Sequence, residues 1–247
     1  MSLSFDDMGK DNLLFVFAIT ATIVGYYGYY YLSQSESIKD WFVGRFLGKK
    51  FWLRWILFQK ICGFIFMGLI PGIIYIFIFN GRISDFGMNL NLLISNWYWL
   101  IGIPMLMVVI NRFLAQGKSL QQQYPQMRLK RWSKEMFALS AFGWIIYLLA
   151  YEYLFRGLLL FLSYEAFGFW PAIAINVAIY SALHMTKGAG ETLGAIPFGI
   201  LTCIITLSTG TMLIPVFAHI GLAVSMDYFA LKYNPEMELN SISGGSQ

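Results

Sequence analysis

Long apolar runs are the feature that most restricts how this chain can fold. A helix that crosses the hydrocarbon core of a bilayer needs about 20 apolar residues, and seven runs approach or exceed that length. Only 12% of the residues are charged, against about a quarter in a soluble domain. Because an open segment in lipid satisfies its own backbone groups only as a helix, we predict an all-α polytopic membrane protein. The predicted spans are 13–32, 56–79, 97–114, 136–162, 170–187, 192–208 and 211–231.

Two basic segments beside these runs predict the orientation of the chain. The segment "SIKDWFVGRFLGKKFWLRW" leads into the second run and mixes Lys and Arg with Trp and Phe, which favours an amphipathic helix lying in the membrane interface. The segment "QGKSLQQQYPQMRLKRWSKE" precedes the fourth run. The positive-inside rule makes both loops cytoplasmic, so seven spans put the N-terminus outside and the C-terminus in the cytoplasm. Since the basic residues cluster beside spans, the net charge of +4 predicts contact with the bilayer and no nucleic-acid partner.

The ends of the chain complete the predicted organisation. The start, "MSLSFDDMGKDN", is acidic and has neither a basic region nor a small-residue cleavage site, so the first run is expected to be a retained span. The polar tail is expected to be disordered. We therefore expect N-terminal helices with an interfacial segment at 1–135, a helical core at 136–231 and the tail at 232–247.

Ionisable side chains inside the predicted spans are few, and such residues usually mark function because burying them in lipid is costly. Glu152 and Arg156 are four residues apart, so they share a helix face and can pair. Taken singly, each polar residue has a structural explanation as a buried ion pair or a packing histidine. Together, polar groups on three separate spans predict one buried cluster. The candidate set for this cluster is Glu152, Arg156, His184, His219 and Asp227, with Asn176 uncharged and Glu191 at a span boundary.

Such a cluster has a limited chemical repertoire. A carboxylate and an imidazole can activate water as general bases, and a second imidazole can donate to the oxyanion of an attacked peptide carbonyl. Two histidines and a carboxylate can also bind a divalent metal, although the chain has no HExxH motif. No other cofactor is expected. Asp227 follows His219 by eight residues, which leaves open whether it faces the same cavity or lies near the cytoplasmic interface.

Three short motifs in this set resemble a known family. They read "YEYLFRG", "YSALH" and "HIGLA" in order along the chain. The pattern is similar to that of the CAAX-protease and bacteriocin-processing family (CPBP, or Abi) of glutamic-type intramembrane endopeptidases. The resemblance covers roughly residues 136–231 and includes the connecting stretch that approaches His219 through "TGTMLIP". It implies catalytic roles for Glu152, Arg156, His184 and His219, and location in the bacterial inner membrane.

Two positions depart from the family pattern. The first glutamate of the family's Glu-Glu pair, which activates water, is Tyr151 here, and the polar residue four after the last histidine is Ala223. A phenol stays protonated near neutral pH, so Tyr151 cannot replace a carboxylate base. Glu152 must then take that role from a position about 100° round the helix. Glu191 and Asp227 are the candidates for the missing polar partner.

These motifs and departures leave two main functional hypotheses. The first is an endopeptidase that cuts a membrane-associated peptide or protein, with Glu152 and His184 activating water, Arg156 holding Glu152 and His219 stabilising the oxyanion. The second, motivated by Tyr151 and Ala223, is a catalytically inactive relative that acts as a regulator, scaffold or immunity protein. A transporter or channel is a weaker third hypothesis, because the polar residues gather at one depth and do not line a path. The sequence predicts neither the substrate nor the oligomeric state.

Overall fold

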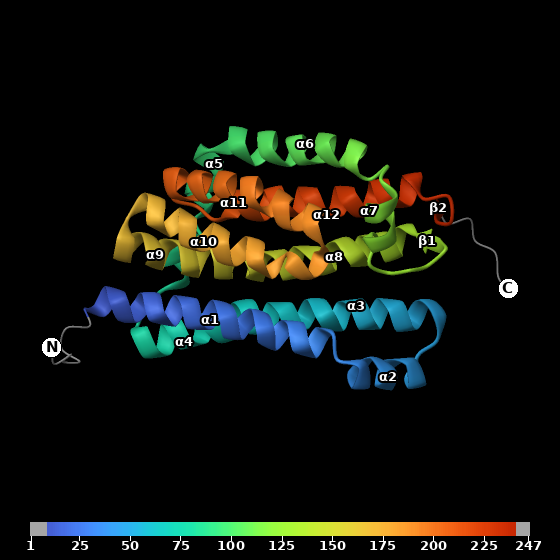
Figure 1. Ribbon diagram of the computed structural model, residues 1–247, viewed down its shortest axis with the longest axis horizontal. Coiled ribbons are helices and arrows are strands. Elements are labelled where there is room, and N and C mark those ends of the chain that lie inside the picture. Colours follow the sequence, from blue (N-terminus) through green and yellow to red (C-terminus); the bar gives the residue numbers. More distant parts are fainter. Residues whose placement is uncertain (1–8, 241–247) are drawn as a thin grey trace. The chain divides into compact units, whose positions relative to one another are not determined.

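A computed structural model describes residues 9–240 of the chain, and nearly all of these residues are helical (Figure 1). Within this range, six helical stretches are long and apolar enough to cross a membrane. This confirms the predicted all-α polytopic membrane architecture. The stretches are Asn12–Ser33, Gly48–Phe79, Trp97–Leu114, Lys134–Phe167, Ala189–Thr209 and Leu213–Tyr233.

The predicted span 170–187 differs from the helix that forms there. Helix α10, Phe169–Leu183, has 15 residues, which gives a length of about 22 Å, short of the roughly 30 Å hydrocarbon core. A short 3₁₀ turn, η5 (Met185–Lys187), follows it. The chain then reverses through Gly188, whose φ of 97° suits glycine alone. Helix α10 thus ends four residues before the predicted boundary, ahead of the glycine-rich "KGAGE" stretch.

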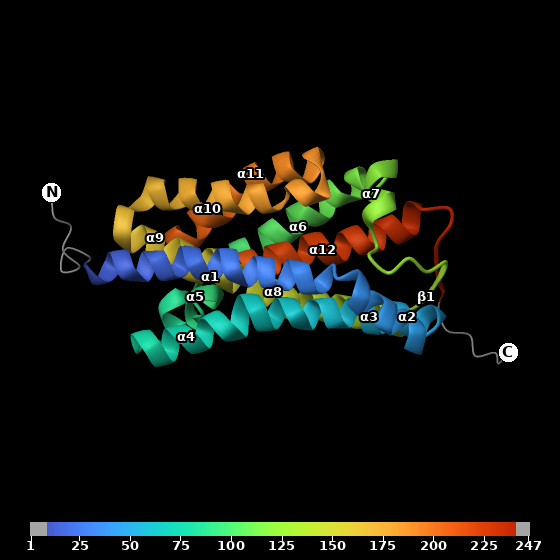
Figure 2. The same ribbon diagram turned by 60° about the horizontal axis from the view of Figure 1, so that its bottom comes forward.

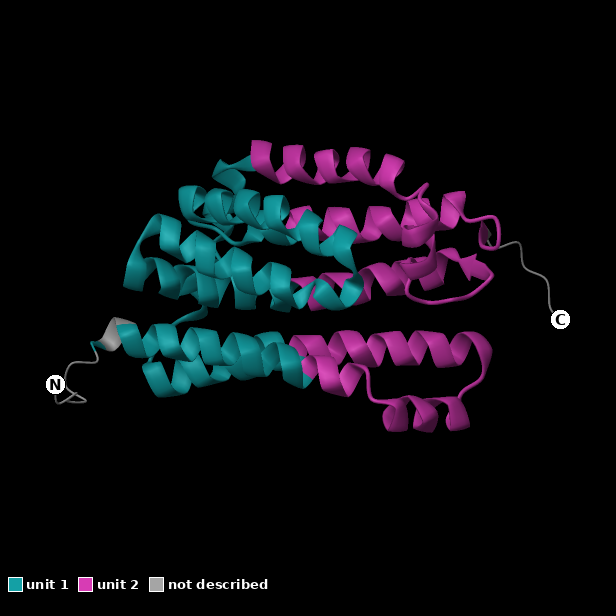
Figure 3. Ribbon diagram, in the orientation of Figure 1, with its two compact units in different colours: residues 1–28, 65–97, 149–216 teal, residues 29–64, 98–148, 217–247 magenta. Residues whose placement is uncertain are grey.

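The described chain divides into two compact units, each made of three segments (Figure 3). Unit 1 contains residues 9–28, 65–97 and 149–216. Its α10 and α11 lie side by side in two views (Figures 1 and 2). The elements of unit 1 are the first part of α1 (Lys10–Ser33), η2 (Ile65–Leu69), α4 (Ile70–Phe79), η3 (Ile83–Phe86), α5 (Leu90–Ser95), the end of α8 (Lys134–Glu152), η4 (Tyr153–Leu159), α9 (Leu160–Phe167), α10, η5, α11 (Ala189–Thr209) and the start of α12 (Leu213–Tyr233).

The core of unit 1 surrounds the η4 segment. Leu154, Phe155 and Leu158 are completely buried. Two π-helical segments, η2 and η4, contact each other. Within η2, a side chain added at Gly68 would place its Cβ 2.8 Å from the Cβ of Ala150 on α8. A small residue is needed there because the two backbones approach so closely, as is common where membrane helices pack.

Unit 2 contains residues 29–64, 98–148 and 217–240. One of its apolar clusters joins Trp55 and Ile56 to Trp132, Met136 and Leu231. Its elements are the end of α1, α2 (Glu36–Arg45), α3 (Gly48–Phe64), α6 (Trp97–Leu114), α7 (Lys118–Gln123), β1 (Arg131–Ser133), the first part of α8, most of α12, and β2 (Glu238–Asn240).

Two predicted segments of unit 2 take a more defined form than expected. The predicted interfacial segment forms α2, which buries none of its residues, and the beginning of α3, which contacts α2. Within the tail expected to be disordered, β2 pairs in parallel with β1, with Arg131 opposite Glu238. Backbone pairing and an ion pair of 3.1 Å between these two side chains hold that part of the tail. Residues 241–247 lie outside the described range.

Candidate functional site

The candidate site of unit 1 is built around a change of helical register. One continuous helical stretch runs from α8 through η4 into α9, and the middle part has π-helical hydrogen bonding. Glu152 is the last residue of α8, and Arg156 lies within η4, every residue of which is buried. π-Helical segments inside α-helices occur frequently at functional sites. This one turns the side chain of an arginine into the protein interior.

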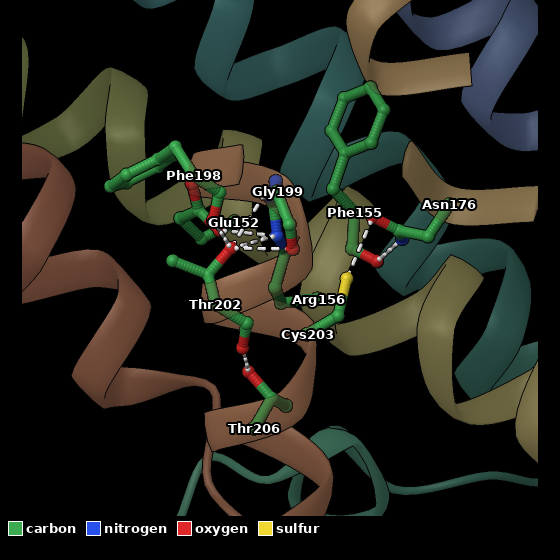
Figure 4. Close-up of polar contacts among 9 residues, drawn as sticks. All are labelled: Glu152, Phe155, Arg156, Asn176, Phe198, Gly199, Thr202, Cys203 and Thr206. Carbon is green, nitrogen blue, oxygen red and sulfur yellow. Dashed lines mark hydrogen bonds and ion pairs between the residues drawn. The ribbon is translucent and has the colours of Figure 1, made fainter. Parts of the chain in front are cut away.

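Glu152 and Arg156 form a fully buried ion pair, as their spacing predicted. The arginine Nε lies 3.4 Å from the glutamate Oε2, and both side chains are 0% exposed. Buried charges are stable only when further polar contacts satisfy them. Thr202 of α11 supplies one, because its hydroxyl accepts hydrogen bonds from Nε and Nη2 of Arg156 at 3.2 and 2.9 Å (Figure 4). The same hydroxyl can donate to the Phe198 carbonyl at 2.8 Å.

A second polar contact fixes the backbone of the π segment. Asn176 of α10, also completely buried, donates from Nδ2 to the carbonyl of Phe155 at 2.6 Å. That carbonyl also accepts from the N–H of Leu160, five residues on, which is the π-helical pattern. The thiol of Cys203 lies 3.2 Å from Asn176 Oδ1 and donates to it (Figure 4). Helices α10 and α11 therefore both hold the segment that carries Arg156.

Tyr180 links this ion pair to His184. The guanidinium carbon of Arg156 lies 4.1 Å from the centre of the Tyr180 ring, a distance typical of a cation–π contact. On the same ring, His184 packs with its centroid 4.6 Å away. Gly199 makes room for this stack, since a Cβ there would come within 3.3 Å of both Tyr180 and Val177. The contacts thus run from Glu152 through Arg156 and Tyr180 to His184.

His184 caps α10 and has a defined tautomer. Its Nδ1 lies 2.8 Å from the Tyr180 carbonyl oxygen. A carbonyl can only accept a hydrogen bond, so Nδ1 carries the proton in this contact. In the neutral ring, Nε2 is then the nitrogen with the lone pair, which is the form required of a general base or a hydrogen-bond acceptor.

Tyr151 and Glu152 face different neighbours, as adjacent helix positions must. The Tyr151 ring is buried against Phe155 at 4.6 Å and against Tyr180 at 5.9 Å, with the His184 ring edge-on at 6.5 Å. Position 151 therefore faces the histidine, whereas position 152 faces Arg156. A tyrosine beside His184 thus occupies the position where the family pattern has its first glutamate.

The remaining predicted residues have other surroundings. His219, which is half-buried, and the buried Ala223 and Asp227 lie on α12 in unit 2. Convergence of His219 with Glu152 stays a prediction. Glu191 lies in the first turn of α11 and forms an ion pair of 3.7 Å with Lys187. Among the described residues, no three side chains of His, Cys, Asp or Glu lie close enough to hold a metal ion.

A groove of about 430 Å³ runs along α10 and α11 beside this cluster. Its lining is mostly apolar, and Trp170 at one end is 69% exposed, so the groove opens at the surface of unit 1. Val177 lines the groove, and a Cβ added at Gly199 would lie 3.3 Å from Val177 and 3.7 Å from Arg156 Nη2. Val177 and Arg156 therefore both approach α11 at Gly199, which places the groove close to the ion pair.

Sequence reasoning missed Thr202 and Cys203. Threonine is common in apolar helices, where its hydroxyl usually bonds to the carbonyl one turn back, as Thr206 does to Thr202 at 2.8 Å. The only available signal was the position of "LTC" in α11, three residues after a glycine. That signal does not distinguish a threonine that holds an arginine from one that bonds to its own helix.

Comparisons with known proteins agree with the motifs. Residues 132–225 match the family model described as type II CAAX prenyl endopeptidase Rce1-like. Curated proteins and solved structures give no match to this chain. The matched residues contain all three motifs, together with the π segment, α10 and α11. Residues 132–225 are therefore similar to the CPBP family of CAAX-protease-like membrane proteins.

Proposed function

We propose that this protein is an intramembrane endopeptidase that hydrolyses a peptide bond of a membrane-associated protein or peptide. The observation that carries the proposal is the completely buried Glu152–Arg156 pair, connected through Tyr180 to His184. A buried ion pair on its own rarely adds stability over apolar packing. The Glu152–Arg156 pair is connected to a histidine of defined tautomer, and the segment resembles a protease family. Both facts favour a catalytic role for the pair.

In the proposed reaction, Glu152 and His184 take a proton from water as the water oxygen attacks the carbonyl carbon of the scissile bond. Negative charge then develops on the former carbonyl oxygen, and an imidazole N–H of His219 stabilises it. The C–N bond breaks as the proton passes to the departing amine. The products are one carboxylic acid and one amine, so a single water molecule is consumed.

Arg156 has two parts in this proposal. Its charge stabilises the carboxylate form of Glu152 in a site from which water is largely excluded. Its Nη1 is buried and has no hydrogen-bond partner among residues 9–240, so it offers a donor to a water or substrate oxygen. Thr202 and Tyr180 hold the guanidinium while that donor is used.

The substrate class follows from the groove on α10 and α11. Its apolar lining suits an apolar segment of a membrane-embedded chain, and its volume lies in the range of ligand sites. We propose that such a segment lies against Val177 and Ala178 while the scissile bond reaches the polar cluster. The bilayer delivers substrates of this kind directly to a lipid-facing groove.

The proposal is tested with purified protein in detergent and a library of membrane-anchored peptides. Wild type is compared with Glu152→Gln and His184→Ala, and with Glu191→Gln as a matched control on a glutamate outside the cluster. Loss of general-base catalysis lowers the rate by about 10²–10⁴-fold, so the first two variants are expected to lose that much and the control to keep its rate. Equal cleavage by all four proteins would contradict the assigned roles.

The alternative of an inactive regulator rests on one observation, the tyrosine at position 151 beside His184. It predicts that wild type cleaves no member of the library, and that Glu152→Gln lowers thermal stability with no hydrolysis to lose. The same experiment therefore distinguishes the two functions.

A further inference from the structure

A second buried pair of charges lies in unit 2, away from the groups used in the proposed reaction. Lys60 of α3 is 3% exposed and Asp227 of α12 is 2% exposed. Both belong to helical stretches long enough to cross a membrane. An isolated charge at such a position is costly, so a pair of opposite charges there has a structural or functional reason.

Trp144 of α8 contacts both members of the pair. The Lys60 ammonium lies 2.9 Å from the centre of one Trp144 ring, with Tyr147 at 4.6 Å. The indole N–H donates to Asp227 Oδ2 at 2.8 Å, and the Ser140 hydroxyl donates to the same oxygen at 3.3 Å. Lys60 and Asp227 also interact electrostatically.

These contacts reinforce one another. Donating a hydrogen bond to a carboxylate increases the electron density of the indole ring, which strengthens its attraction for a cation on its face. The Lys60 side chain also packs closely against α8 at Gly143, where an added Cβ would lie 3.2 Å from it. Three helices are therefore tied together at one aromatic ring.

The contacts also define how α12 lies along α8. Asp227 meets Trp144 and Ser140, while Tyr228, the next residue on α12, packs against Phe137 at 6.3 Å between ring centroids. Four residues after Asp227 on α12, Leu231 packs in one apolar cluster with Met136 and Trp132, which precede Ser140 in the chain. Residues later in α12 thus meet residues earlier in α8, so the two helices are antiparallel within unit 2. Apolar contacts tolerate sliding by a turn, whereas a hydrogen bond between an indole and a carboxylate does not.

His219 lies on the same helix, eight residues before Asp227, a distance of about 12 Å along the axis. A shift of α12 by one turn would displace His219 by about 5.4 Å, which exceeds the tolerance of a hydrogen bond to an oxyanion.

We infer that Asp227 is a positioning residue for His219. Held by Trp144 and by the charge of Lys60, it fixes the axial register of α12 along α8 and thereby the position of the imidazole. This inference rests on the proposed function for its catalytic consequence. The inference also states that Lys60 is coupled to Asp227 and that Asp227 is coupled to His219. These two couplings do not depend on hydrolysis.

The coupling of the two charges is tested by a double-mutant cycle on thermal unfolding in detergent. Lys60→Met and Asp227→Asn each leave an opposite charge buried without its partner, so each is expected to lower the unfolding midpoint. The double variant is expected to lose clearly less than the sum of the two losses. Lys39→Met with Glu36→Gln, an exposed pair, is the control and should be additive. Additive losses at Lys60 and Asp227 would overturn the inference.

The coupling to His219 has a readout that needs no activity. The chain has only two histidines, so ¹⁵N-histidine labelling gives signals from two imidazole rings. Signals that disappear in His184→Ala belong to His184, and the remaining ones belong to His219. Asp227→Asn is expected to move or broaden the His219 signal, and Glu36→Gln to leave it unchanged. An unmoved His219 signal in a folded Asp227→Asn variant would overturn the positioning role.

Where wild type cleaves a peptide, kinetics give a third test. Asp227→Asn is expected to lower kcat at least tenfold with little change in KM. In a His219→Ala background it should have no further effect, because its influence passes through that imidazole. Equal losses in both backgrounds would indicate a general loss of structure and would overturn the inference. If wild type cleaves nothing, the proposed function fails, while the unfolding and labelling experiments still decide the inference.

Discussion

At the scale of single residues, the cluster of unit 1 depends on satisfying a buried arginine. Arg156 has only donors to offer, and the acceptors that meet it are the Glu152 carboxylate and the Thr202 hydroxyl. When a buried donor loses its acceptor, the free-energy cost of removing that donor from water is no longer offset by a hydrogen bond. The stability of the cluster should therefore respond to small changes at Thr202.

Thr202→Val removes the hydroxyl at nearly constant volume and is expected to destabilise the protein by about 1–3 kcal/mol. Thr202→Ser retains the hydroxyl and should recover most of that loss. Thr206→Val is the matched control, because the Thr206 hydroxyl bonds only to a carbonyl of its own helix in the described contacts. The midpoint of thermal unfolding in detergent measures all three, and an equal loss at both threonines would contradict the role of Thr202.

The sequence predicted the pairing of Glu152 with Arg156 but not the residues that surround the pair. The spacing of Glu152 and Arg156 fixes their relative position on one helix, so their pairing could be predicted. Their contact with Thr202 and Tyr180 depends on how three helices pack, which no local spacing encodes. For the same reason, Asn176 was identified as a polar residue within a span, while its bond to the Phe155 carbonyl was not.

At the scale of elements, the π segment and the two helices that hold it form the working part of unit 1. A π-helical register is defined by its hydrogen bonds, and it leaves no periodic mark in a mostly apolar run such as "YLFRGLL". The spans were predictable because their length and apolarity are local properties. The early end of α10 shows the limit, since the helix ends at Leu183, four residues before the predicted boundary at residue 187.

Close packing of α11 on α10 gives a prediction at Gly199. Gly199→Val adds atoms beside Tyr180 and Val177, where a Cβ alone already comes within 3.3 Å, so it should cost about 1–3 kcal/mol of stability and lower activity. Gly194→Val carries the same helix-propensity change at an exposed position with open space around it. Unfolding midpoints measure both, and equal effects would show that propensity, and not packing, explains the loss.

The groove gives a separate prediction. Ala178→Trp fills part of it and is expected to raise KM by roughly fivefold or more while kcat changes little, the pattern of lost substrate binding. Ala182→Trp, an exposed position of α10 outside the groove, should leave both constants near wild type. Unchanged KM in the Ala178 variant would contradict the groove as the place of substrate binding.

At the scale of the whole molecule, composition and apolar runs were sufficient to predict an all-α membrane protein. They could not predict the division into two compact units or the pairing of β1 with β2, because both depend on contacts between distant segments. The orientation in the membrane, with the N-terminus outside and the C-terminus in the cytoplasm, remains a prediction; it rests on the basic loops and on counting 170–187 as a seventh span.

Cysteine labelling tests that orientation. Cys62 and Cys203 are both buried, so a cysteine introduced at Gly9 or Ser119, two exposed positions, is the accessible thiol. A membrane-impermeant reagent applied to intact cells is expected to label Gly9→Cys and to spare Ser119→Cys until the cells are opened. The reverse pattern would contradict the predicted orientation.

The central claim is that Glu152 and His184 activate a water molecule for peptide hydrolysis. It is tested most directly by cleavage of membrane-anchored peptides in H₂¹⁸O, with mass spectrometry of the new carboxyl terminus. We expect wild type to place one ¹⁸O in the new carboxyl group of each cleaved peptide, and Glu152→Gln and His184→Ala to form that product about 10²–10⁴-fold more slowly. Equal rates of ¹⁸O incorporation by all three proteins, or no incorporation by folded wild type, would contradict the claim.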